Sequence, residues 1–201
     1  MKVLLKNVRI AFCDSLHEPK EYEPGDGKFR HSANALVEPG SDNDKAIREA
    51  MKGVAVEMFK AKATQNLKIW ENNTQKCCYT SGDIKADKYD GFAGMMVLSA
   101  HRAAKQGAPG VYDRTVDPKT GKLRVLTARD GKPYAGSYVN MTVDIWAQGA
   151  PNEGVRATLI GVQFVQDGDA FGAGAPPRPE DFDDLSVDEM PAGEEDGDLA
   201  A

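Results

Sequence analysis

The sequence has few of the side chains that most often carry catalysis or bind metals. It contains three histidines and three cysteines, which are His17, His31, His101, Cys13, Cys77 and Cys78. The histidines are too scattered to match a zinc spacing, and adjacent cysteines fit a metal tetrahedron less easily than a C-x-x-C pair. An odd cysteine count is also a poor disulfide framework. The sequence therefore predicts no metal site and no cofactor.

Nucleotide-binding and nuclease motifs are missing as well. The Gly-Lys pair at 121–122 is followed by leucine, and position 116 is valine, so the P-loop pattern is not met. The glycines at 168, 172 and 174 follow a predicted strand but open no helix, which excludes a dinucleotide fingerprint. Acidic residues of the body are too dispersed for a two-metal site. We expect a protein that is not an enzyme, with a metal-dependent nuclease in a divergent fold as an alternative.

Long apolar segments are lacking too. No run approaches the roughly 18 apolar residues that indicate a membrane span. The N-terminal stretch MKVLLKNVRIAF has no long apolar core and no small-residue cleavage site, so it indicates a strand rather than a signal peptide. We expect a cytoplasmic protein that does not contact a membrane.

Basic residues are absent from the C-terminal end of the chain. Glu180 to Ala201 holds ten Asp or Glu and no Lys or Arg. From Arg178 onward one base stands against ten acids, a net charge of −9, whereas the preceding residues hold 24 bases and 21 acids, a net of +3. This asymmetry favours nucleic-acid binding by the body and a docking or regulatory role for the tail. We expect one domain over residues 1–172, followed by a linker and a disordered acidic tail over 173–201.

Local patterns predict a strand, a loop, a second strand and then a helix in the first third of the chain. Residues 2–12 and 31–39 are strand-like, and the polar stretch 14–30 is a loop. Ser41 and Asp44 resemble a capping box at the start of a helix. Apolar side chains then recur at three- and four-residue spacing on one helix face, namely Ile47, Met51, Val54, Met58 and Ala61.

The remainder of the body is strand-like and broken by turns. Strands are predicted at 76–80, 91–101, 122–128, 137–147 and 155–166, with a turn at 117–121. Within 137–147, valine, methionine and isoleucine alternate with polar residues, Tyr138 and Trp146, which gives one core face and one polar face. Five or more strands with one inserted amphipathic helix predict a mainly β protein, an OB-fold-like Greek-key barrel.

Basic and aromatic residues are interleaved along these strands. Single-strand binders combine a basic groove with aromatic faces on which bases stack. The residues that we predict to bind nucleic acid are Lys76, Tyr79, His101, Arg102, Tyr112, Arg114, Arg124, Lys132, Tyr134 and Tyr138. Strand aromatics more often belong to the core, and we expect packing roles for Phe92, Trp146 and Phe164.

Three stretches resemble the small single-stranded DNA-binding proteins of tailed bacteriophages. They are GAPGVYDR at 107–114, DGKPYAGSYVNMTVDIWAQ at 130–148, and GVRATLIGVQFVQDGDAFGAG at 154–174, which runs into the acidic tail. The resemblance covers essentially the whole body. It implies an OB-fold, sequence-tolerant single-stranded DNA binding, and a role in phage DNA replication or recombination inside the infected host cell.

The acidic tail then has a candidate role beside a basic groove. A flexible polyanion can occupy the groove weakly, be displaced by DNA, and dock a phage or host polymerase, helicase or recombinase. The candidate docking residues are Asp181, Phe182, Asp183, Asp184 and Leu185. Two alternatives stay open: the tail only maintains solubility, or the whole chain is a structural or accessory phage protein without nucleic-acid contact.

Overall fold

The computed structural model describes residues 1–21, 24–25 and 27–172; the linker and tail expected over 173–201 lie outside this range. The strands are β1 (Lys2–Ala11), β2 (Lys20–Glu21), β3 (Phe29–Val37), β4 (Tyr79–Ser81), β5 (Met96–Ala103), β6 (Gly110–Val116), β7 (Leu123–Val125), β8 (Tyr138–Gln148) and β9 (Gly154–Gln166). The helices are α1 (Asp42–Phe59) and α2 (Ala63–Trp70), with short 3-10 turns η1 (Lys60–Lys62), η2 (Gly82–Lys85), η3 (Ala104–Gln106) and η4 (Ala128–Asp130).

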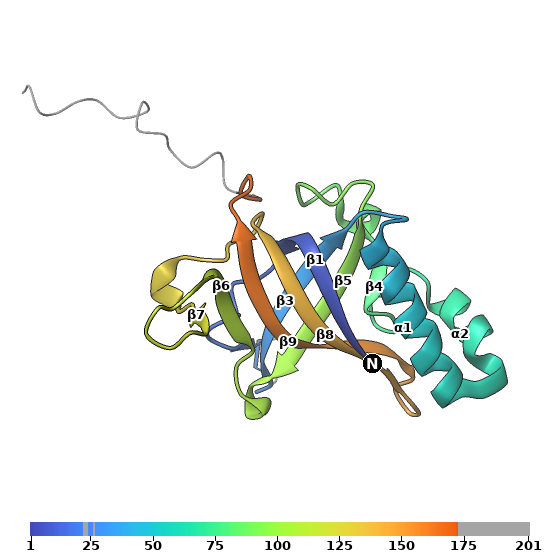
Figure 1. Ribbon diagram of the computed structural model, residues 1–201. Coiled ribbons are helices and arrows are strands. Elements are labelled where there is room, and N and C mark those ends of the chain that lie inside the picture. Colours follow the sequence, from blue (N-terminus) through green and yellow to red (C-terminus); the bar gives the residue numbers. More distant parts are fainter. Residues whose placement is uncertain (22–23, 26, 173–201) are drawn as a thin grey trace, which may run out of the picture.

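Strand pairing forms a ring that returns to its starting strand (Figure 1). β1 pairs antiparallel with β3 and β8, β3 with β5, and β8 with β9. The ring is completed by one parallel pair between β5 and β9, His101↔Thr158. A Greek-key barrel that is partly open at one seam is the OB-fold arrangement, so the predicted mainly β, OB-fold-like class is confirmed.

Alternating burial along the strands shows why this sequence forms the barrel. Val139, Met141, Val143 and Ile145 of β8 are fully buried, and the residues between them face outward. This is the alternation that the sequence predicts for 137–147. The motifs GAPGVYDR and GVRATLIG meet where β6 pairs with β9, because Gly110 lies opposite Gly161. A Cβ at Gly161 would lie 3.0 Å from the Gly110 carbonyl oxygen, so the small residue permits this approach.

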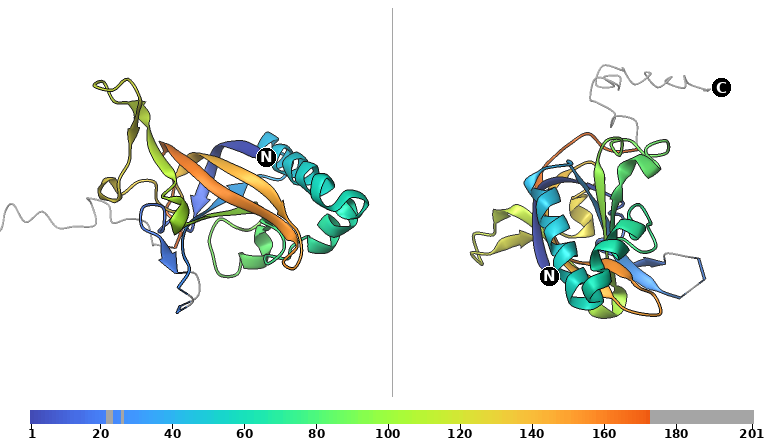
Figure 2. Two further views of the ribbon diagram at one scale, coloured as in Figure 1. Left: turned by 90° about the horizontal axis from the view of Figure 1, so that it is seen from below. Right: turned by 90° about the vertical axis from the view of Figure 1, so that its right-hand side faces the viewer.

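The predicted helix begins where its cap is expected. The Ser41 side chain accepts a hydrogen bond from the Asp44 backbone N–H, at 3.2 Å. Ile47, Met51 and Val54 are buried against the barrel core. The helical region lies at one end of the barrel, where α1 and α2 run side by side (Figures 1 and 2).

Three local expectations differ from the structure. Met58, in the last turn of α1, and Ala61 are exposed. The helix ends at Phe59 and the chain turns through η1 into α2, which the sequence pattern did not predict. Strand β5 begins at Met96, whereas the preceding segment folds over the outer face of the sheet and buries Phe92. Residues 110–116 form β6, which pairs with β7 in a hairpin that projects from the barrel (Figure 2).

Candidate nucleic-acid interface

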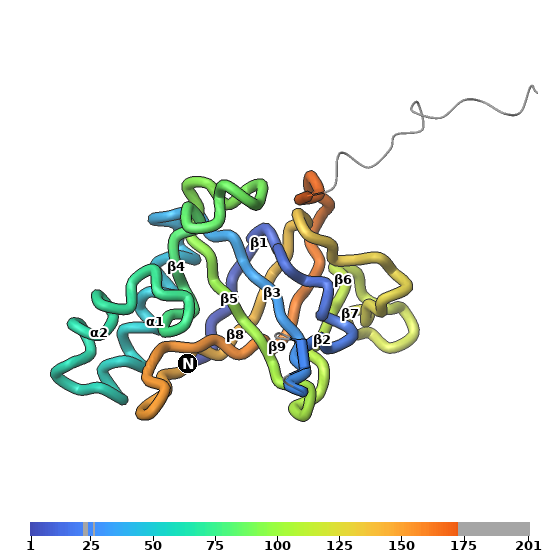
Figure 3. The backbone as a smooth tube through the Cα atoms, turned by 180° about the vertical axis from the view of Figure 1, so that it is seen from behind, coloured from blue at the N-terminus to red at the C-terminus, as the bar shows by residue number. Residues whose placement is uncertain are grey.

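A groove of about 740 Å³ runs over the outer face of β3 and β5. Antiparallel register places Ser32 beside His101 and Asn34 beside Ser99, and these side chains form the polar floor. Phe12, Asp14 and Ser15, in the segment between β1 and β2, line one side of the groove. The backbone of this segment can be followed in Figure 3. The face of strands two and three of an OB-fold is where such barrels bind oligonucleotides, and β3 and β5 hold those places in the ring. We call this feature the β3–β5 groove.

Hydrogen bonds fix the segment between β1 and β2 onto the floor. The buried His31 imidazole lies 2.8 Å from the Ser15 carbonyl oxygen through its Nδ1 atom. Ser15 Oγ accepts a hydrogen bond from the Ser32 backbone N–H at 2.8 Å and lies 2.9 Å from Ser32 Oγ. The first loop of the barrel is therefore held against β3, and the groove is a preformed feature of this conformation.

Basic residues outnumber acidic residues in the described lining of the groove. Its basic residues are Lys20, Arg30, Lys85 and Arg156, and its acidic residues are Asp14 and Glu21. Lys20 and Asp14 form an ion pair of 3.9 Å between exposed side chains, which contributes little in water. The Glu21 carboxylate accepts hydrogen bonds from the backbone N–H groups of Gly25 and Gly27. Among the described residues that line the groove, four cations stand against two carboxylates, an excess that attracts a polyanion.

Aromatic rings stand at one side of the groove. Phe12 and Tyr89 are in edge-to-face contact, with centroids 4.8 Å apart, and both line it. The Lys85 ammonium lies 5.4 Å from the Phe12 ring centroid. Phe92 is buried beneath them and packs against both rings, at 5.7 Å. This combination of cations and supported aromatic faces is the one that single-strand binders use.

His101 lies on the groove floor, opposite Ser32. Burial lowers the pKa of its imidazole, and the neighbouring cations Arg30 and Arg156 lower it further. The ring is therefore neutral at pH 7 in the free protein. A phosphate placed beside it would favour its protonated form.

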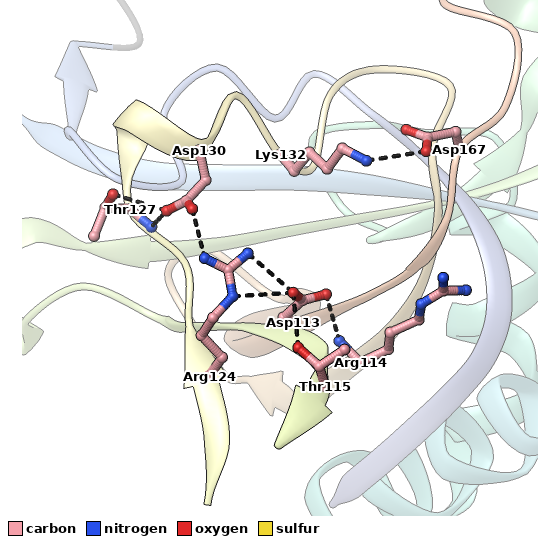
Figure 4. A network of polar contacts seen from close by, with 8 residues as sticks. All are labelled: Asp113, Arg114, Thr115, Arg124, Thr127, Asp130, Lys132 and Asp167. Atoms are coloured by element: carbon pink, nitrogen blue, oxygen red, sulfur yellow. Dashed lines mark hydrogen bonds and ion pairs between the residues drawn. The ribbon is translucent and has the colours of Figure 1, made fainter. Parts of the chain in front are cut away.

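Six predicted binding residues lie away from the groove, near the β6–β7 hairpin and the adjacent end of β9. We call Tyr112, Arg114, Arg124, Lys132, Tyr134 and Tyr138 with their carboxylate partners the hairpin cluster. Figure 4 shows its three cations and their polar contacts. Arg124 donates to Asp113 at 2.9 Å and to Asp130 at 2.7 Å, and Lys132 pairs with Asp167 at 3.0 Å. Arg114 donates to the Val165 carbonyl at 3.4 Å.

Carboxylates pair with two of the three cations in the hairpin cluster. Arg124 pairs with Asp113 and Asp130 and Lys132 pairs with Asp167, whereas Arg114 donates to the Val165 carbonyl. The hydrogen bonds from the Thr127 backbone, Arg124 and the Thr127 hydroxyl lower the pKa of Asp130 to about 2, so this carboxylate stays ionised. Sequence alone showed the cations of this region but not the carboxylates that partly offset the charges of Arg124 and Lys132.

The tyrosines of the hairpin cluster differ in accessibility. Tyr112 is 38% exposed. The Tyr134 hydroxyl donates to Asp167 and to the Gly168 carbonyl, and Tyr138 is half-buried beneath the Arg9 guanidinium, 5.7 Å from its ring centroid. Tyr112 is therefore the tyrosine of this group whose ring is most open to a base.

The structure contradicts the predicted stacking role of Tyr79. Its side chain is 4% exposed and belongs to the core, and its hydroxyl donates to Asp44 Oδ1 at 2.7 Å. Burial and this hydrogen bond raise the pKa of Tyr79 above its usual value. A base cannot reach the ring, because α1 covers the hydroxyl end of the side chain. The sequence pattern, a tyrosine three residues after Lys76, cannot distinguish the two faces of a short strand.

The remaining predicted residues lie near the groove or beside it. His101 lines it, and Lys76 stands between the lining residues Gln75 and Cys77. Lys76 is held there because its carbonyl accepts a hydrogen bond from the Val155 backbone N–H, at 2.8 Å. Arg102 is turned toward η3, where it donates to the carbonyls of Gln106 and Gly107. The predicted tail residues 181–185 lie outside the described part of the chain.

Sequence reasoning missed most of the groove. The residues that it did not single out are Phe12, Lys20, Arg30, Lys85, Tyr89 and Arg156. The available signal was topological: in an OB-fold, strands two and three and the first loop form the binding face. That rule points to residues 12–37, which the interleaving of basic and aromatic residues after position 75 did not include, and to β5, of which it included His101 and Arg102.

Other kinds of site find little support in the described residues. Within them no group of three or more His, Cys, Asp or Glu side chains could hold a metal ion. All three cysteines are buried free thiols. No helix in the described ranges is long and apolar enough to cross a bilayer.

Comparisons with known proteins identify a related phage sequence and solved structures with a similar fold. A chain of 41% identity over 194 residues, covering 94% of this chain and 96% of the relative, is the putative protein p50 of Acyrthosiphon pisum secondary endosymbiont phage 1. Among solved structures, the single-stranded DNA-binding protein from bacteriophage Enc34 in complex with ssDNA superposes with a TM-score of 0.63 at 18% identity, over 84% of this chain and 88% of that one. Its C-terminal truncation gives a TM-score of 0.62 at 17% identity over the same shares.

The solved structures show that the fold is shared, and the match to a family model shows which family the chain belongs to. The model described as Enterobacter phage Enc34, ssDNA-binding protein, matches residues 1–194. This is a family of binding proteins, in agreement with the expectation that the chain is not an enzyme. The extent of the match, which spans the barrel, the helices and the hairpin, establishes that the chain belongs to the Enc34 phage single-stranded DNA-binding protein family.

Proposed function

We propose that this protein binds single-stranded DNA with little sequence preference, through the β3–β5 groove, in phage DNA replication or recombination. The observation that carries the proposal is the gathering of four basic side chains and an aromatic pair on the strand-two and strand-three face of an OB-fold-like barrel. Family membership supports the ligand class. The Enc34 protein, which shares the fold, has been solved in complex with ssDNA.

Sequence tolerance follows from the chemistry of the groove. Lysine and arginine side chains contact phosphates, which are the same at every nucleotide, and aromatic rings stack on any base. Rigid duplex DNA keeps its bases stacked inside the helix, so it cannot offer them to Phe12 and Tyr89. The groove should therefore prefer flexible single strands to duplex.

We further propose that residues 1–172 form the DNA-binding domain and that the tail regulates it. The tail carries ten acids and no base after Pro179, beside a body with positive net charge. Such a polyanion competes with DNA for the groove and, once displaced, is free to dock a polymerase, helicase or recombinase. The candidate docking segment is Asp181 to Leu185.

Two titrations test these proposals. The first measures anisotropy of labelled oligo(dT) and of a duplex over a range of salt, and we expect tighter single-strand binding that weakens as salt rises. Equal affinity for duplex would refute the preference for single strands, and no binding to either would refute the function and leave a structural or accessory protein.

The second titration compares the full chain with a chain cut after Pro179, which has a net charge of +4. The cut chain should bind single strands more tightly at about 20 mM salt and by a smaller factor at about 200 mM, because exposed charges are screened. A scrambled tail of the same composition should restore the weaker binding while losing a partner that reads residues 181–185. Identical affinities at both salt concentrations would exclude competition by the tail.

A further inference from the structure

The two tryptophans of the chain lie in opposite surroundings. Trp70 is 7% exposed and packs edge-to-face on Phe59, with centroids 5.2 Å apart. Trp146, which the sequence favoured as a packing residue, is 40% exposed on the outer face of β8. An indole of this size is usually covered in a folded protein, because it is the largest apolar side chain. The exposure of Trp146 therefore needs an explanation in terms of what could contact it.

Strand register links Trp146 to the β3–β5 groove. Trp146 pairs with Arg156 across β8 and β9, and paired residues project to the same face of a sheet. Arg156 lines the groove. The next outward position of β9, Thr158, pairs with His101 on the groove floor. The outer surface thus continues from the groove, across the seam between β5 and β9, to Trp146.

A hydrogen bond to β9 fixes the orientation of the Trp146 indole. Its Nε1–H donates to Thr158 Oγ1 at 3.0 Å, so the polar atom is satisfied within the protein and the ring is anchored to β9. A ligand at the ring then needs only a flat π-face, and Arg156 beside it supplies a positive charge for a phosphate. A fixed aromatic ring next to an arginine is suited to a stacked base and its backbone.

We propose that Trp146 is a base-stacking platform that extends the groove beyond Arg156, where it holds a nucleotide at one end of the bound strand. The proposal rests on the function proposed above and adds the path of the bound DNA. The DNA runs from the aromatic pair Phe12 and Tyr89, over the groove floor at His101, to Trp146 on β8.

Because the chain has two tryptophans, fluorescence can assign the contact. The test uses the full chain and the variants Trp70→Phe and Trp146→Phe, titrated with oligo(dT). Quenching should persist in Trp70→Phe, where Trp146 is the reporter, and disappear in Trp146→Phe, where the buried Trp70 remains. Quenching that is unchanged in Trp146→Phe would overturn the proposal.

Affinity as a function of strand length provides a second measurement. Trp146→Ala should bind a long oligo(dT) about 5- to 150-fold more weakly than the parent, the range expected for one stacked base. The shortest oligo(dT) that the parent binds, which fills only the groove, should bind both proteins equally. If Trp146→Ala and the parent bind oligo(dT) of every length with equal affinity, the platform is refuted. Binding of oligo(dT) by the parent would still support the proposed function. Should Trp146→Ala not fold, the Trp146→Phe titration decides alone.

Discussion

Removal of one groove cation tests where the DNA lies. Arg156 is half-buried at the start of β9 and lines the β3–β5 groove. Each phosphate contact with a single strand contributes about −0.7 to the slope of log affinity against log salt, so four cations give at most about −2.8. The variant Arg156→Ala should therefore reduce the steepness of the slope by about 0.7.

The same contact sets the loss of affinity at a fixed salt concentration. Relative to a 1 M reference, a slope contribution of 0.7 corresponds to about fivefold in affinity at about 0.1 M salt. Anisotropy of labelled oligo(dT), measured at several salt concentrations, gives both quantities. Arg156→Lys keeps the charge and should keep the slope, which separates loss of charge from loss of packing.

A matched control removes the same charge elsewhere. Arg129 is exposed in η4, outside the groove, so Arg129→Ala changes the net charge equally without removing a groove contact. Its slope should equal that of the parent. If Arg156→Ala keeps the parent slope of log affinity against log salt, the placement of DNA in the groove is refuted. The refutation is clearest if the slope becomes shallower in Arg129→Ala instead.

Two further outcomes follow from the groove floor and the core. Burial, and then Arg30 and Arg156, lower the pKa of His101 in the free protein, and a bound phosphate should raise it, so that DNA binding is accompanied by proton uptake. Affinity for oligo(dT) should therefore increase as the pH is lowered from about 7.5 to about 5.5. The variant His101→Gln should not show this increase. A pH-independent affinity in the parent would count against phosphate beside His101. Tyr79→Phe should lower the free energy of unfolding by about 1–3 kcal/mol, because it deletes the buried hydrogen bond to Asp44, and should leave DNA affinity unchanged. Denaturant melts and anisotropy check the two effects, and weaker DNA binding by a stably folded variant would contradict the core role.

Local rules in the sequence were sufficient for several elements. The Ser41 cap and the spacing of Ile47, Met51 and Val54 predict α1, because helix capping and helical periodicity depend on residues a few positions apart. Alternation in 137–147 predicts β8 for the same reason. Charge asymmetry and the resemblance carried by residues 107–174 indicated a nucleic-acid binder, in agreement with the family match over 1–194.

The sequence by itself determined the class of protein and the faces of its long elements, and only the tertiary structure decided which side chains form the interface. The groove combines Lys20, Lys85 and Arg156, which lie far apart in the chain and meet through strand pairing. Pairing with Asp113 and Asp130 also neutralises Arg124, while register leaves Trp146 exposed next to Arg156. These outcomes depend on long-range contacts between side chains, and local composition and periodicity carry no information about such contacts.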